Sequence, residues 1–259
     1  MVSSKRRTNR GKRSRFDETS ESTDVLNRIQ DFKEQFLTTL NDLSPVTYQH
    51  DFIMETYLWL AAFFVAYEFG QIIAPLLSGI LRPIFGDVFI AFFAFIGVPL
   101  AYNLFPAFAQ ISQEDERVET AVVSCILGCL RSILFSDFTY VGVVPPTFFA
   151  PFVIGINAQI IGPKIANNGR EQFLLATIGC AAMVDLLFSF LDYTLDVPYL
   201  LLLGVNTSIL FVHLQHLLKT LSTSWTPKNM LQWQMGALTA THFAHSFFHY
   251  LLSSEDPRK

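Results

Sequence analysis

Long apolar runs separated by short polar stretches dominate the chain from residue 52 onward, whereas the first part of the chain is mostly polar. These runs cover residues 52–74, 84–109, 120–135, 143–161, 173–191, 197–218 and 231–252. Most of them approach the roughly 20 apolar residues that a helix needs to cross the hydrocarbon core of a bilayer. The pattern predicts an all-α fold, a polytopic membrane bundle of seven transmembrane helices, or six if the last run re-enters.

The polar and apolar stretches also predict how the chain is divided. Residues 1–23 carry a basic block followed by an acidic, Ser/Thr-rich piece, which predicts a disordered tail. In residues 24–44 apolar side chains recur at helical spacing, which predicts an amphipathic helix that ends before Ser44-Pro45. Residues 52–252 form the predicted transmembrane domain, and residues 253–259 form a short polar tail.

Composition agrees with a membrane protein. Of the 259 residues, 51% are hydrophobic and 15% are charged, against about 25% charged residues in a typical soluble domain. The three cysteines form no CxxC pair, so the spacing suggests neither a zinc ribbon nor a disulfide framework. No aromatic residue interleaves the basic block, so we expect no nucleic-acid binding.

Lysine and arginine in the loops predict the orientation of the chain. With the N-terminus in the cytosol, the cytosolic loops hold Arg117, Lys164, Arg170, Lys219 and Lys228, whereas the opposite loops hold only Arg82. Positive residues favour the cytosolic side of a membrane. The first apolar run begins too far from the start to be a secretory signal peptide, so we expect this run itself to begin insertion.

Five of the six histidines fall in the last two apolar runs: His213, His216, His242, His245 and His249. The last three are three and four residues apart, so a helix places them in one stripe. Ionisable side chains inside a membrane are costly and mark functional sites by default. Ordinary hydrogen bonding between helices explains them equally well. Both interpretations remain open from the sequence.

Charged side chains inside the apolar runs are the second group of candidate site residues. Arg131 is the only lysine or arginine within a predicted span, and Asp185 and Glu68 lie deep in theirs. A buried acid needs a partner or a water-filled path. We therefore expect Arg131 to pair with Asp185 or with Glu68.

Several stretches resemble, in order, the transmembrane BAX inhibitor motif family. They are residues 43–50 (LSPVTYQH), the charged loop 110–117, residues 146–149 (PTFF) and residues 199–215 (YLLLLGVNTSILFVHLQ). The resemblance implies a seven-helix bundle in the endoplasmic reticulum or another endomembrane. It also implies a pH-sensitive Ca²⁺ leak and partners among the membrane proteins of cell-death regulation. His213 and His242 stand at the positions of that family's two pH-sensing aspartates.

Histidine at these positions changes the expected chemistry. Imidazole is a poor ligand for Ca²⁺ and a good one for Zn²⁺. We therefore expect a Ca²⁺ leak pathway, or a regulator of calcium homeostasis and cell death, with an altered response to pH. The alternatives are a membrane scaffold or interaction protein without transport, and a histidine-ligated metal protein. We expect no enzyme, because no nucleophile–base constellation, Gly-rich phosphate loop or paired catalytic carboxylate stands out.

Overall fold

The computed structural model describes residues 26–27, 29–31, 33–43, 49–104, 112–140, 142–165, 169–223 and 227–255. The predicted disordered tail, residues 1–23, lies outside these residues. The chain divides into two compact units, Met1–Asp42 and Leu43–Lys259, which we describe separately.

The first unit contains a helix whose described residues run from 26 to 40. The Thr38 hydroxyl donates to the carbonyl of Glu34 at 2.7 Å, so the side chain bonds within its own helix. Leu26, Ile29 and Leu37 are 65%, 58% and 45% exposed. Their spacings of three, eight and eleven residues place them on one face of the helix.

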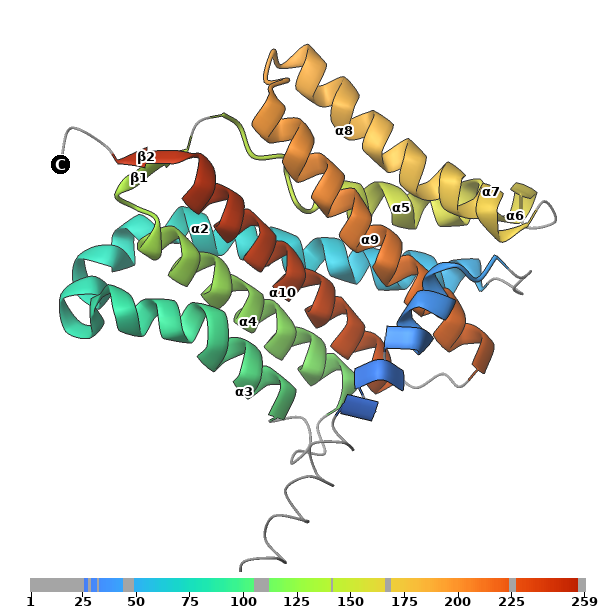
Figure 1. The fold of residues 1–259 in the computed structure, drawn as a ribbon, viewed down its shortest axis with the longest axis horizontal. Helices are drawn as coiled ribbons and strands as arrows, with labels where there is room; N and C mark the ends of the chain where they lie inside the picture. The colour runs from blue at the N-terminus through green and yellow to red at the C-terminus, as the bar shows by residue number, and fades with distance from the viewer. Residues whose placement is uncertain are drawn as a thin grey trace, which may run out of the picture. The chain divides into compact units, whose positions relative to one another are not determined.

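The second unit begins with a long helical segment that a break at Gly86 divides in two. α2 (His50–Phe92) leads through a π-helical turn, η1 (Phe93–Gly97), into α3 (Val98–Leu104). Pro75 lies inside α2, so the predicted end of the first run at residue 74 was wrong. The chain turns at Gly86, whose φ of 71° is readily adopted only by glycine. Beyond it α3 runs back beside α4 (Figure 1).

The remaining elements follow in order along the second unit (Figure 1). They are α4 (Gln113–Leu134), β1 (Phe138–Tyr140), α5 (Phe149–Ile160), α6 (Gly162–Ile165), α7 (Arg170–Leu174), η4 (Leu175–Gly179), α8 (Cys180–Leu191), α9 (Val197–Thr223), α10 (Pro227–Leu252) and β2 (Ser253–Glu255). The all-helical class therefore holds for the described residues, apart from one short ribbon of strands.

This ribbon was not predicted. β2 pairs antiparallel with β1, with Phe138 opposite Glu255 and Tyr140 opposite Ser253. It joins the end of α10 to the chain that follows α4. Part of the predicted polar tail, residues 253–255, is therefore held in a sheet.

Three helical segments of the described chain are long and apolar enough to cross a membrane: His50–Tyr102, Arg170–Leu191 and Val197–Leu221. Seven such spans were predicted. The short apolar helix α5 has only 12 residues, and a helix of this length reaches about 18 Å. α4 opens with three acidic residues, which makes it less apolar than the predicted third run.

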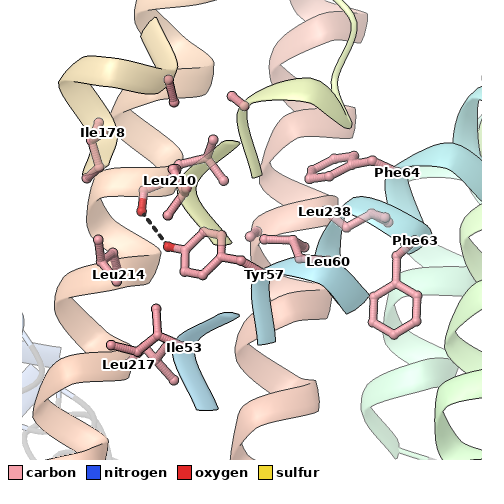
Figure 2. Packing of buried hydrophobic residues seen from close by; sticks show 14 of the residues in the cluster. Ile53, Tyr57, Leu60, Phe63, Phe64, Ile178, Leu210, Leu214, Leu217 and Leu238 are labelled. Atoms are coloured by element: carbon pink, nitrogen blue, oxygen red, sulfur yellow. Dashed lines mark hydrogen bonds between the residues drawn. The ribbon is translucent and has the colours of Figure 1, made fainter. Parts of the chain in front are cut away.

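The hydrophobic core of the second unit is built around the first half of α2. Tyr57, Leu60 and Phe64 are buried there, and Leu210 on α9 and Leu238 on α10 pack into the same cluster. Figure 2 shows these side chains converging from the three helices. α2 also packs against α4 and α5. Because α2 packs against these neighbours, polar side chains on its buried face meet groups from other helices.

Glycine allows α2 and α4 to touch backbone to backbone. A Cβ atom built on Gly128 would stand 2.8 Å from the carbonyl carbon of Tyr67, and one built on Gly70 would stand 2.8 Å from that of Cys125. Real Cβ atoms do not approach so closely. Small residues at such crossings are typical of helices that pack in membranes.

Candidate functional site

Buried polar side chains of the second unit meet along α2, and the first of these contacts joins α2 to α9. Nδ1 of His213 lies 3.1 Å from the hydroxyl oxygen of Tyr57. The Tyr57 hydroxyl donates to the carbonyl of Leu210 at 3.2 Å, as Figure 2 shows. Because this hydroxyl has one proton, it accepts from Nδ1–H of His213. The imidazole is thereby held inside the core.

A second tyrosine–histidine contact joins α2 to α10. The hydroxyl of Tyr67 lies 3.2 Å from Nδ1 of His242, and both side chains are buried. Tyr57 and Tyr67 are ten residues apart, which is about 15 Å along a helix. His213 and His242, the two positions matched to the aspartate pair by the family resemblance, are therefore held by different tyrosines.

Arg131 on α4 is the centre of a third group. Its side chain is 5% exposed and donates to Oε1 of Gln71 at 2.7 Å and to the carbonyl of His245 at 3.4 Å. Nε2 of Gln71 donates to Glu68 at 2.7 Å, and the same carboxylate accepts from the hydroxyl of Thr147 at 2.7 Å. The Arg131–Glu68 pair that we expected is thus connected through an amide rather than formed directly.

The other expected partner of Arg131 lies elsewhere. Asp185 is buried on α8, and its carbonyl accepts from the Tyr199 hydroxyl at 3.2 Å. Among the described residues, no ion pair joins Asp185 to Arg131. His245, whose carbonyl contacts Arg131, has its Nε2 3.0 Å from Oδ1 of Asn206 on α9. The arginine group therefore ties α4, α2 and α10 together, and α9 joins them through this histidine.

The two remaining histidines, His216 and His249, pack against aromatic rings. His216 stacks on Trp233 with ring centroids 4.2 Å apart. His249 lies 4.7 Å from the ring of Phe135 and 5.3 Å from that of Tyr140. Burial raises the pKa of the Tyr140 hydroxyl above its ordinary value, so this hydroxyl stays protonated at neutral pH.

The arrangement provides little metal chemistry. Across the described part of the chain, no group of three or more His, Cys, Asp or Glu side chains is placed to hold a metal ion. His213 and His242 contact tyrosines, His216 a tryptophan and His245 an asparagine, and His249 packs against the rings of Phe135 and Tyr140. The predicted histidine stripe on α10 is therefore divided among three separate surroundings. These contacts connect α9 and α10 to neighbouring elements.

Sequence reasoning missed the partners of these side chains. Tyr67 and Gln71 were not singled out, although each is a polar residue within an apolar run. Polar side chains in a predicted membrane segment are expected to meet other polar groups. Searching every run for such residues, and not only for ionisable ones, would have found them.

Comparison with known proteins corrects the family resemblance. A family model described as "Interactor of ZYG-11" matches residues 6–255, almost the whole chain. No curated protein and no solved structure matches the chain. The resemblance to the BAX inhibitor motif family was therefore wrong, and so were the Ca²⁺ leak, the calcium and cell-death roles and the cell-death partners inferred from it. Short matches of apolar residues arise readily between unrelated membrane proteins of similar composition. The chain belongs to the family of ZYG-11 interactors.

Proposed function

We propose that this chain is a membrane-embedded interaction protein that binds a ZYG-11 protein and has no catalytic or transport activity of its own. The family's description, over residues 6–255, carries the proposal because it names a protein partner. The buried polar side chains of the second unit support it, since several of them form hydrogen bonds that join one helix to another.

Exposed apolar side chains support membrane insertion. They are concentrated on the second half of α2 and on α8 and the start of α9. The most exposed include Ile72, Leu76, Ile84, Val88, Leu175, Met183, Phe190 and Val197. Soluble monomers rarely expose contiguous apolar patches of more than a few hundred Å². We place the second unit in an endomembrane with its seven predicted segments buried there, and the loop lysines and arginines support a cytosolic N-terminus.

The helix of the first unit is the proposed docking element. It belongs to a unit separate from the helical bundle, and Leu26, Ile29 and Leu37 leave an apolar stripe exposed. The opposite face carries Asp31 and Gln35, both exposed. An amphipathic helix of this kind binds by placing its apolar face in a groove of a partner protein. The partner named by the family description is the occupant to which we commit.

The test compares two matched triple variants of the full-length chain. One replaces Leu26, Ile29 and Leu37 by serine, and the other makes the same change at Asn27, Asp31 and Gln35, which lie away from the apolar stripe on the same helix. Binding of purified ZYG-11 to each protein, held in lipid nanodiscs, is measured by biolayer interferometry. We expect the apolar-face variant to bind at least about tenfold more weakly, since three buried apolar anchors are lost.

The control variant should bind like the parent, because its changes leave the apolar stripe intact. Equal affinities for the parent and the apolar-face variant would contradict docking through this helix. If the apolar-face variant instead loses only its association with protein-free vesicles, the stripe contacts lipid and the docking proposal fails.

A further inference from the structure

A cavity of about 800 Å³ lies between α2 and the end of α4. β1 and α10 contribute to its walls through Phe138 and His249. Arg131 and Arg82 both line it, and serine hydroxyls line it on α2 and on α4, among them Ser78 and Ser132. This volume falls in the range of pockets that hold small organic ligands.

Arg131 is the charged side chain of this cavity that has no directly bonded carboxylate in the described part of the chain. No carboxylate side chain lines it among the described residues. Arg131 is buried, its two hydrogen-bond acceptors are the neutral amide of Gln71 and the carbonyl of His245, and its Nε–H has no described partner. A buried charge held only by neutral groups is costly. An anion in the cavity would lower that cost.

The second arginine separates this cavity from a neighbouring one. Arg82 pairs with Asp87, at 2.7 Å between Nε and Oδ1, and with Asp137. Both carboxylates line the adjoining cavity of about 810 Å³, whose other walls are mainly apolar and aromatic. Arg82 is therefore neutralised by these two carboxylates, and Arg131 is the arginine lining the first cavity whose Nε–H has no partner among the described residues.

We propose that the cavity between α2 and α4 is a binding site for a phosphate-bearing anion, either the headgroup of an acidic lipid or a free phosphate. Guanidinium groups bind phosphate through charge-assisted, often bidentate hydrogen bonds. The hydroxyl of Ser132, which also lines the cavity, supplies a further donor. The site is independent of the docking helix, because all its residues belong to the second unit.

The test changes Gly79, which lines the cavity and whose added Cβ would meet no atom within 4 Å. Gly79→Glu adds a carboxylate beside the arginines, and Gly79→Gln adds a side chain of the same size without charge. Replacing a helix-interior glycine favours the helix, so both variants should fold. Full-length protein in detergent is titrated with phosphatidic acid, with phosphatidylcholine as a control, and separately with inorganic phosphate.

Binding is measured by native mass spectrometry and by the shift in unfolding temperature. The parent should bind phosphatidic acid or inorganic phosphate in preference to phosphatidylcholine, and the probe that binds identifies the source of the phosphate. The Glu variant should bind about tenfold more weakly than the Gln variant, because only the carboxylate competes with the anion. Failure of both phosphate probes to bind, or equal binding by the two variants, would overturn the proposal.

Discussion

Gly128 allows the backbone of α4 to lie against that of α2, and a single added methyl group tests this contact. In Gly128→Ala the new Cβ would stand 2.8 Å from the Tyr67 carbonyl carbon. The Tyr67 carbonyl oxygen lies closer still. Carbon atoms prefer about 3.5–4.0 Å, so the contact with the carbonyl carbon alone requires the helices to separate by at least roughly 0.7–1.2 Å. A gap of about 0.5–1 Å already loses a quarter to a half of the dispersion energy of each contact.

The expected loss of stability follows from two opposing effects. Overpacking costs about 1–3 kcal/mol, and the upper end applies because a clash with backbone cannot be relieved by rotating a side chain. Replacing glycine by alanine in a helix returns about 1 kcal/mol. The net loss in the free energy of unfolding is therefore about 2 kcal/mol, which lowers the unfolding temperature by about 4–8 °C for a domain of this size.

Thermal unfolding of the protein in detergent measures this change. Far-ultraviolet circular dichroism follows the loss of helix as the temperature rises. Gly236→Ala on α10 is the matched control, because an added Cβ there meets no atom within 4 Å. The control should be as stable as the parent or more stable. An unfolding temperature for Gly128→Ala equal to that of its parent would refute the close contact between α2 and α4.

Three further predictions concern the buried groups and the orientation. Tyr57→Phe and Tyr67→Phe should each lower the free energy of unfolding by about 1–3 kcal/mol. The double variant should lose the sum of the two amounts in denaturant titrations, because the two histidine contacts are separate. A loss that differs strongly from this sum would contradict the separation of the two contacts. Arg131→Met should remove phosphate binding in the cavity titration, whereas unchanged binding would exclude Arg131 from the site. The orientation is tested in a background in which the three native cysteines are replaced by serine. A membrane-impermeant thiol reagent should label Glu114→Cys from the cytosolic side and Tyr193→Cys, at a 98% exposed position, from the opposite side. Labelling of both cysteines from the same side would contradict the orientation.

Local pattern was enough to predict the helices but not their ends or their partners. The predicted runs 197–218 and 231–252 lie within α9 and α10, because their apolar residues extend over nearly the full helix. Pro75 was taken as a helix end, yet α2 continues through it, and the turn comes at Gly86 instead. Proline only lowers the stability of a helix, and the packing of α2 against its neighbours offsets that cost.

The candidate site depended on long-range contacts that a single sequence does not show. The histidines were found because they are ionisable residues in apolar runs, but their partners Tyr57 and Tyr67 lie more than 150 residues away along the chain. We expected Arg131 to pair directly with an acid. In the structure the amide of Gln71 lies between Arg131 and Glu68 and bonds to both. The pairing of β1 with β2 likewise joins segments far apart in the sequence.

Equilibrium binding between the full-length chain and purified ZYG-11 tests the central claim most directly. The chain is held in lipid nanodiscs, and empty nanodiscs and nanodiscs with the apolar-face triple variant serve as controls. Saturable binding to the parent chain, weakened in the variant and absent from empty nanodiscs, is the predicted result. No binding to the parent chain, at ZYG-11 concentrations that saturate typical specific complexes, would contradict the account.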